Sequence, residues 1–154
     1  RVFDKAGMSR TAYLRSDELP GDAALGYLFD DGDRTNVLHL PVRGNGDGGA
    51  YTTAGDLTTF WRALFEGRIV SSDTVAEMAR PRADIPDEEQ RVGMGLFLLE
   101  TSDAVLIEGY DAGASFRSTH DPVTKRTVSV LGNSSEGAWK LIYELGIAPP
   151  TASW

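Results

Sequence analysis

Residues 108–116 read EGYDAGASF and join one apolar run, residues 104–107, to a second, residues 114–120. The first six of these nine residues include two glycines and an alanine, so the backbone is nearly bare of side chains. A bare strand edge lets a ligand come within hydrogen-bond range of main-chain N–H groups. The same composition is typical of a tight turn or bulge between two strands. The stretch therefore indicates either a turn or a ligand-binding strand edge.

The composition is that of a folded protein with an acidic surface. The chain has 154 residues, 41% of them hydrophobic, and a formal net charge of −8, which fits one domain or part of one and excludes disorder. Acidic residues are spread along it and no basic run is present, so nucleic acid is not an expected partner. Cysteine is absent, which excludes disulfides, thiolate metal sites and a cysteine nucleophile. No apolar run approaches the roughly 20 residues that span a bilayer.

The first eight residues read as the end of a helix, with Gly7 as its C-terminal cap. Neither a helix start nor a signal-peptide pattern accompanies them. We therefore expect residues 1–154 to be the C-terminal segment of one longer domain. A signal peptide or membrane anchor would then lie on the missing N-terminal part, and the cell compartment stays open.

Three helices are predicted from their caps and apolar stripes. Thr53 caps a helix over residues 54–66, in which apolar residues recur at helical spacing. Ser72 is expected to cap a second helix that reaches residue 80. A final helix is expected to open at residues 133–136, with the two serines there as N-caps, and to end at Gly146.

The other segments favour strands joined by short loops. Residues 81–90 read as a polar linker. The expected extended segments are residues 37–42, 92–100, 104–107, 114–120 and 127–131. Short loops favour antiparallel neighbours, so we expect three to four antiparallel strands covered by the last helix. The predicted fold class is α/β of the α+β type.

Several motifs are better explained by structure than by ligands. Residues 44–49 match G-x-G-x-x-G, but the next helix begins too late for its N-terminus to meet a pyrophosphate. The acidic residues 30–33 lack the glycine and glutamate of a calcium loop, which favours a solvated turn. His39 and His120 are isolated in the sequence, so structural roles are expected for both. No metal site and no cofactor are predicted.

Five segments, in order, resemble the C-terminal part of the serine β-lactamase and penicillin-binding-protein-like family. Residues 2–11, VFDKAGMSRT, resemble its F-x-P-L-G-M-x-x-T, and residues 48–57, GGAYTTAGDL, resemble G-G-L-Y-S-T-A-x-D-L. Residues 92–96, VGMGL, resemble its Y-G-L-G-W strand, and residues 121–122 and 128–134 resemble its last hairpin, which ends in Asn. The resemblance implies a β-lactamase/transpeptidase-like fold of the branch with class C β-lactamases, D-alanyl-D-alanine carboxypeptidases and esterases.

The same resemblance implies a catalytic role for residues 108–116. Tyr110, Asp111 and Ala112 would occupy the three positions of the family's third motif, Lys or His, Thr or Ser, then Gly. Gly113, which follows, would supply a backbone N–H to the oxyanion hole. The family's other two motifs, Ser-x-x-Lys and Tyr-x-Asn, are absent from this sequence. The fragment is therefore expected to be inert without the segment that carries the nucleophile.

The third motif departs from the family pattern in ways that bear on the substrate. A tyrosine is uncharged near neutral pH, Asp111 brings a negative charge, and Ala112 replaces a glycine. Either Arg117 compensates by binding a substrate carboxylate, or the substrate is a neutral ester or amide, or activity has faded. Arg117 also fits an ordinary solvent-facing strand residue.

The resemblance predicts an enzyme that acts through an acyl-serine intermediate on an ester, amide or β-lactam. Esterase or peptidase activity is favoured over strong β-lactamase activity. A non-catalytic module that binds a peptidoglycan-like or acyl ligand is the alternative. Expected partners are a small-molecule or peptide-like substrate and the missing N-terminal segment. A second copy of the chain is a further candidate, because a fragment would expose a cut sheet face.

Overall fold

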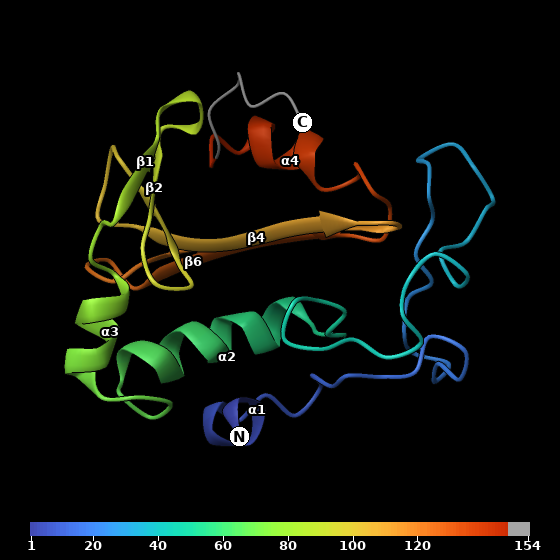
Figure 1. Ribbon diagram of the computed structural model, residues 1–154, viewed down its shortest axis with the longest axis horizontal. Coiled ribbons are helices and arrows are strands. Elements are labelled where there is room, and N and C mark those ends of the chain that lie inside the picture. Colours follow the sequence, from blue (N-terminus) through green and yellow to red (C-terminus); the bar gives the residue numbers. More distant parts are fainter. Residues whose placement is uncertain (148–154) are drawn as a thin grey trace.

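One six-stranded antiparallel sheet organises the fold (Figure 1). The computed structural model describes residues 1–147. The strands lie in the sheet in chain order, so each strand pairs with the next. Their bounds are β1 Ala83–Ile85, β2 Gln90–Val92, β3 Phe97–Leu99, β4 Val105–Asp111, β5 Ala114–Asp121 and β6 Arg126–Gly132. Short connections produce this order because they join antiparallel neighbours, and the α+β prediction is confirmed.

The three long strands, β4, β5 and β6, form the most extensively paired part of the sheet. Asp111 pairs with Ala114, so residues 112–113 make a two-residue turn between β4 and β5. The strand expected to end at Ile107 therefore continues four residues further. Residues 108–116 thus form both a strand and a turn. The first part of this segment belongs to β4, and its centre forms the hairpin tip.

Side chains alternate between the two faces of the sheet, as the pleat requires. On β5, Ser118 and His120 face the long helix α2, Ala54–Phe65. The Trp61 ring of that helix stacks on His120 with centroids 5.7 Å apart, and its Nε1 donates to Ser118 Oγ at 2.8 Å. Arg117 points to the opposite face, where α4, Trp139–Glu144, lies (Figure 1). The sheet is thus enclosed between two helical layers.

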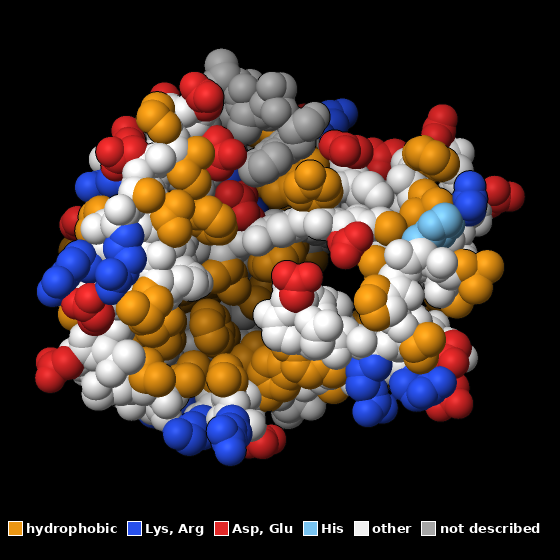
Figure 2. All heavy atoms as spheres, viewed as in Figure 1, with side chains coloured by type: hydrophobic (Ala, Val, Ile, Leu, Met, Phe, Trp, Pro, Cys, Tyr) orange, Lys and Arg blue, Asp and Glu red, His pale blue; other side chains and the backbone are white. Residues whose placement is uncertain are grey.

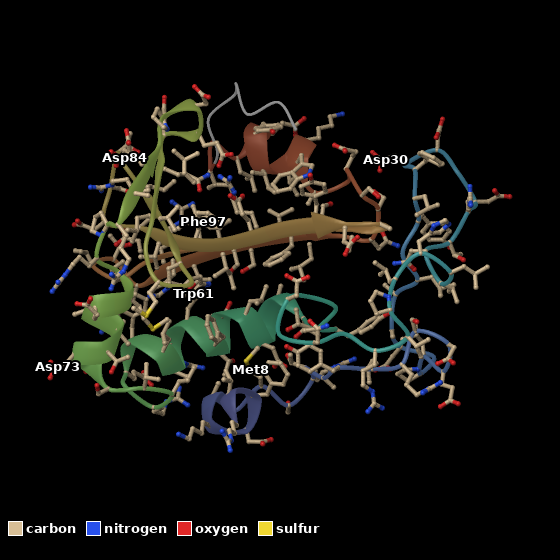
Figure 3. The ribbon with its side chains drawn as sticks, in the orientation of Figure 1. Met8, Asp30, Trp61, Asp73, Asp84 and Phe97 are labelled. Atoms are coloured by element: carbon tan, nitrogen blue, oxygen red, sulfur yellow. The ribbon has the colours of Figure 1, made fainter. Side chains whose placement is uncertain are left out.

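The main core lies between the sheet and α2. Trp61 and Leu64 of the helix are almost fully buried and form one cluster with Leu98 and Val105 of the sheet. Figure 3 shows Trp61 pointing from the helix toward the strands. The space-filling view shows hydrophobic side chains gathered in the hollow between these layers (Figure 2). A smaller cluster on the other face joins Val130 to α4.

The helix boundaries follow their local signals closely. The Thr53 side chain accepts a hydrogen bond from the Asp56 N–H at 3.1 Å, which confirms the predicted cap of α2. α1, Val2–Ala6, ends at Gly7, whose φ of 81° is left-handed as expected of a C-cap. The cap of α3, Ser72–Met78, is Ser71 rather than Ser72, because the Ser71 hydroxyl accepts from the Thr74 N–H.

The strand predictions were wrong at three places. Residues 81–90 are not only a linker, because β1 and the start of β2 lie within them and the short 3₁₀ turn η1, Pro86–Glu88, joins the two. Residues 92–100 are two strands, since the Gly93 N–H donates to the Leu96 carbonyl and closes a turn. Residues 37–42 form turns and bends. A strand of three residues is held mainly by its backbone hydrogen bonds. Its side chains are too few to show the alternation that predicts a strand from sequence.

Candidate active site

The candidate site is the tip of the β4–β5 hairpin, which holds the three expected motif positions and Gly113, the residue that follows them. The Tyr110 side chain is 58% exposed, and Asp111 is exposed beside it. The Asp111 carboxylate accepts a hydrogen bond from the N–H of Ala112 at 2.7 Å. Gly113 is buried and has a φ of 74°, a left-handed conformation that favours glycine. The tip therefore combines an exposed polar edge with a buried backbone donor.

Two side chains from distant segments hold the peptide group between Ala112 and Gly113. The Asn36 side-chain amide donates to the Ala112 carbonyl at 2.9 Å. The Gly113 N–H donates to the Ser135 hydroxyl, also at 2.9 Å. The same peptide group is therefore bonded at its C=O by one loop and at its N–H by another.

Close packing around Asn36 explains why two glycines stand here. A Cβ at Gly113 would lie 2.8 Å from the Asn36 Cβ, and a Cβ at Gly26 would lie 2.3 Å from its amide nitrogen. Both distances are shorter than ordinary contacts, so larger residues require the loop to move. Asn36 itself is 8% exposed. The loop that carries it is thus packed tightly against the hairpin tip.

The connection from β6 to α4 forms the other wall of the site. Ser134 Oγ donates to the Asp30 carboxylate in a very close contact. The buried Ser115 hydroxyl on β5 donates to the Ser134 carbonyl at 2.9 Å and accepts from the Ala138 N–H at 3.0 Å. The expectation that Ser134 and Ser135 cap α4 is therefore wrong, because the helix begins after Ala138, without a side-chain cap.

An open hollow of about 350 Å³ adjoins this wall. Its lining comes from the early loop and from the end of β6: Tyr27, Phe29, Asp30, Gly32, Asn133 and Ser134. Figure 3 shows Asp30 on the loop beside the ends of the long strands. The hollow therefore borders the contact between Asp30 and Ser134.

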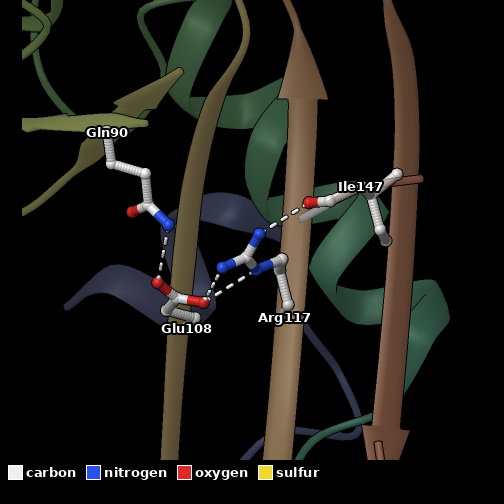
Figure 4. Close-up of polar contacts among 4 residues, drawn as sticks. All are labelled: Gln90, Glu108, Arg117 and Ile147. Atoms are coloured by element: carbon white, nitrogen blue, oxygen red, sulfur yellow. Dashed lines mark hydrogen bonds and ion pairs between the residues drawn. The ribbon is translucent and has the colours of Figure 1, made fainter. Parts of the chain in front are cut away.

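Arg117 lies away from this space, inside the protein. Its side chain is 1% exposed, and its guanidinium donates to Glu108 at 2.7 Å from Nε and pairs at 2.5 Å from Nη2 (Figure 4). A third bond runs from Nη1 to the carbonyl of Ile147 at 2.6 Å. The Gln90 amide donates to the second Glu108 oxygen at 3.3 Å. The solvent-facing interpretation of Arg117 is therefore wrong.

His120 has the structural role expected of it. It is 5% exposed, stacks on Trp61, and its Nδ1 lies 2.8 Å from Thr127 Oγ1. Burial lowers the pKa of His120, and the nearby Asp121 opposes that shift. Seven residues of strand separate it from Gly113, which is roughly 20 Å at the rise of a β-strand. His120 is therefore too far away to act at the hairpin tip.

Asn36 and Ser135 are the site residues that the sequence did not reveal. Asn36 carries no local signal, because it lies in a loop and its partner is 76 residues away. Ser135 resembles a helix cap, since it follows a strand and precedes a helix. Its contact with Gly113 exists because the β6–α4 connection folds back over the hairpin.

Residues 1–147 contain neither a metal-ligand cluster nor a membrane-spanning helix. Within this part of the chain, no group of three or more His, Asp or Glu residues is placed to hold a metal ion. None of the helices described has the length and apolarity needed to cross a bilayer.

Comparisons with solved structures place this geometry in a known fold. A penicillin-binding protein from Bacillus halodurans is 32% identical, with a TM-score of 0.85 over 95% of this chain. An octameric penicillin-binding protein homologue from Pyrococcus abyssi is 23% identical, with a TM-score of 0.71 over 94% of this chain. A D-stereospecific amidohydrolase from Streptomyces sp. is 17% identical, with a TM-score of 0.64 over 90%. This chain spans 47%, 36% and 46% of those chains, respectively.

The family assignment rests on the sequence as well as on the fold. Among curated proteins, no sequence matches the chain significantly. The family model described as Beta-lactamase, by contrast, matches residues 1–145, nearly the whole chain. The six-stranded sheet between helical layers agrees with the solved penicillin-binding-protein structures. The chain therefore belongs to the β-lactamase family, as the order of its sequence motifs predicted.

Proposed function

We propose that this chain is the C-terminal part of a serine hydrolase domain whose nucleophile lies on a preceding segment. The observation that carries the proposal is the family match over residues 1–145, together with coverage of 47% of the Bacillus halodurans chain. The sequence holds neither Ser-x-x-Lys nor Tyr-x-Asn, the motifs that would carry the nucleophile and its proton relay. On this proposal the 154 residues contribute one wall of the active site and are inactive alone.

The proposed reaction is acyl transfer through serine. The serine oxygen bonds to the substrate carbonyl carbon, and the carbonyl oxygen becomes an oxyanion. The bond to the leaving group then breaks, and the leaving group departs with the serine proton. Water hydrolyses the acyl-serine to release the acid and restore the hydroxyl. The Gly113 N–H is the donor proposed for the oxyanion, a kind of contact worth about 3–4 kcal/mol of barrier.

The side chains at the tip support a neutral ester or amide as substrate. Asp111 places a carboxylate at the exposed edge, where it repels an anionic substrate. Arg117 was considered above as a cation that could bind a substrate carboxylate. Its guanidinium instead donates hydrogen bonds to Glu108 and to the Ile147 carbonyl. We propose that Arg117 supports β4 and that Tyr110 and Ala112 line the substrate side of the tip. The name of the Streptomyces neighbour, an amidohydrolase, is compatible with this choice.

Covalent labelling of the full-length protein tests the proposal. A fluorophosphonate, which is uncharged at its reactive group, is expected to label the protein faster than a fluorescent penicillin, which carries a carboxylate. Replacing the upstream nucleophilic serine by alanine should abolish both signals. If a correctly folded full-length protein reacts with neither probe, the catalytic proposal is refuted and the non-catalytic ligand-binding module takes its place.

Self-association is a separate part of the proposal. The Pyrococcus abyssi homologue is described as octameric, and the same fold over 94% of this chain motivates a homo-oligomer here. Light scattering of the full-length protein gives the molar mass directly. A monodisperse monomer across the working concentration range would contradict the assembly without affecting the hydrolase proposal.

A further inference from the structure

The loop over residues 44–50 carries the only asparagine in the sequence that a glycine follows, Asn45 before Gly46. The loop includes the G-x-G-x-x-G segment, whose geometry does not suit a pyrophosphate. Residues 45–50 are all exposed. Glycine restricts its backbone least of all residues, which lets its nitrogen approach the preceding side chain. The pair therefore has the sequence and the solvent access that an intramolecular attack on an asparagine requires.

A hydrogen bond holds the Asn45 side chain over the backbone that follows it. Its Oδ1 accepts from the Asp47 N–H at 2.8 Å, so the side chain is folded toward the Gly46 backbone. A hydrogen bond to a carbonyl oxygen polarises the group, which makes the Cγ carbon more open to a nucleophile. The bond uses the oxygen of the amide, whereas the nitrogen is the atom that leaves when the amide is attacked.

The other two asparagines are held by the nitrogen that would have to leave. The Asn36 amide nitrogen donates to the Ala112 carbonyl at 2.9 Å, and this side chain is 8% exposed. The Asn133 amide nitrogen donates to the Leu25 carbonyl at 3.0 Å. The residues that follow them, a valine and a serine, each carry a Cβ that restricts the backbone. Of the three asparagines, Asn45 is therefore the most reactive.

We propose that Asn45 is a site of spontaneous deamidation, with water as the co-reactant. The Gly46 nitrogen bonds to the Asn45 Cγ, the bond from Cγ to the side-chain nitrogen breaks, and ammonia leaves with the proton of the Gly46 N–H. Water then opens the cyclic imide at either of its carbonyls, which gives aspartate or isoaspartate at residue 45. Each event adds a negative charge to the exposed loop. The reaction is independent of the proposed hydrolase function.

The two products change the loop differently. Aspartate keeps an oxygen that can accept from the Asp47 N–H, whereas isoaspartate carries the main chain through Cγ and lengthens the backbone by a carbon. The Asn45 N–H donates to the Gly48 carbonyl at 2.8 Å. A Cβ at Gly44 would lie 2.4 Å from that same carbonyl oxygen. Isoaspartate therefore disturbs a loop whose backbone segments are already in close contact.

Mass spectrometry of the full-length protein, incubated in mildly alkaline buffer for a series of times, tests the proposal. Trypsin cleaves after Arg43 and Arg62, and the peptide between these sites holds Asn45 as its only side-chain amide. Asn36 and Asn133 fall on two other tryptic peptides, so one digest follows all three sites. The Asn45 peptide should gain the mass of an amide-to-acid change well before the other two.

Two glycine-to-alanine variants provide a matched control. A Cβ added at Gly46 or at Gly48 meets no atom within 4 Å beyond its chain neighbours, so both variants should fold like wild type. Gly46→Ala should slow deamidation severalfold, because the Cβ restricts the backbone of the attacking residue. Gly48→Ala should leave the rate unchanged, although it also removes a glycine from the loop.

The relative rates decide the outcome. Fastest mass gain at Asn45, slowed by Gly46→Ala and not by Gly48→Ala, supports the proposal. A wild-type rate in Gly46→Ala, a rate at Asn36 or Asn133 equal to that at Asn45, or no mass gain at Asn45 would each overturn it. None of these results bears on the hydrolase proposal, which covalent labelling tests separately.

Discussion

Replacing Arg117 by methionine should destabilise the full-length protein strongly. The guanidinium is 1% exposed and its partner Glu108 is 6% exposed, so both charges have left water. The substitution keeps most of the side-chain volume but removes the guanidinium that pairs with Glu108. The buried Glu108 carboxylate then keeps only the hydrogen bond from the Gln90 amide, which at 3.3 Å is longer than the bonds from Arg117. It also removes the donor to the carbonyl of Ile147, and this bond ties the segment after α4 to the sheet.

The expected loss follows from the cost of an uncompensated buried charge. Breaking a buried pair from one side costs about 3–5 kcal/mol of unfolding free energy. Replacing both partners by apolar residues removes that charge, so Arg117→Met combined with Glu108→Leu should lose only the Ile147 contact. An unpaired buried carbonyl costs about 1–3 kcal/mol. The double variant is therefore expected to be more stable than the Arg117→Met single variant.

Urea titration of wild type, both single variants and the double variant completes a double-mutant cycle. The slope of the unfolding free energy against urea concentration should be the same in all four proteins. An equal slope shows that each exposes the same surface area on unfolding. A loss below about 1 kcal/mol for Arg117→Met, against the 3–5 kcal/mol expected of a broken buried pair, would refute the reasoning. So would a double variant less stable than that single variant.

Three further predictions test the tip, a helix cap and a buried ring. Gly113→Ala forces a left-handed φ on a residue with a Cβ and pushes that atom to 2.8 Å from Asn36, so chemical denaturation should show a loss of about 1–3 kcal/mol. Thr53→Ala removes the hydroxyl that accepts from the Asp56 N–H and should cost about 1 kcal/mol in the same assay, whereas Thr53→Ser should restore most of it. Burial lowers the pKa of His120 in the folded state below its ordinary 6.5, so the unfolded chain binds more protons and stability falls as the pH drops below that value. Thermal unfolding at several pH values should show His120→Gln with a weaker fall, and equal pH dependence in both proteins would contradict the assignment.

Local signals located α2 well but missed the start of α4 and the short strands. α2 was located to within one residue, because its cap and its apolar stripe lie within the helix itself. β1 and β2, with three residues each, offer no period to read, and their pairing depends on neighbours brought in by the rest of the sheet. Residues 92–100 were predicted as one strand although they form the end of β2, a turn and β3. The turn that begins at Gly93 was missed because its sequence resembles a continuation of the strand.

The sequence pointed to only some of the residues that lie at the candidate site. The order of the sequence motifs and their resemblance to the family pointed to residues 110–113. In the structure these four residues lie at the tip of the β4–β5 hairpin. Arg117 was placed on the right strand, but the pairing that buries it depends on which face of β5 meets α4. Asn36 and Ser135 act across 76 and 22 residues, a separation that no local pattern records.

The sequence by itself pointed to a β-lactamase-like fold through the order of its motifs, and its glycines marked residues 108–113 as a nearly bare stretch of backbone, because motif order and glycine content can be read along the chain. Only the tertiary structure decided which way the peptide between Ala112 and Gly113 points. Its direction depends on Asn36 and Ser135, which reach it from two other loops and hold its C=O and its N–H. A peptide next to glycine has more than one accessible orientation, so packing between distant segments, rather than local preference, selects the one that is seen.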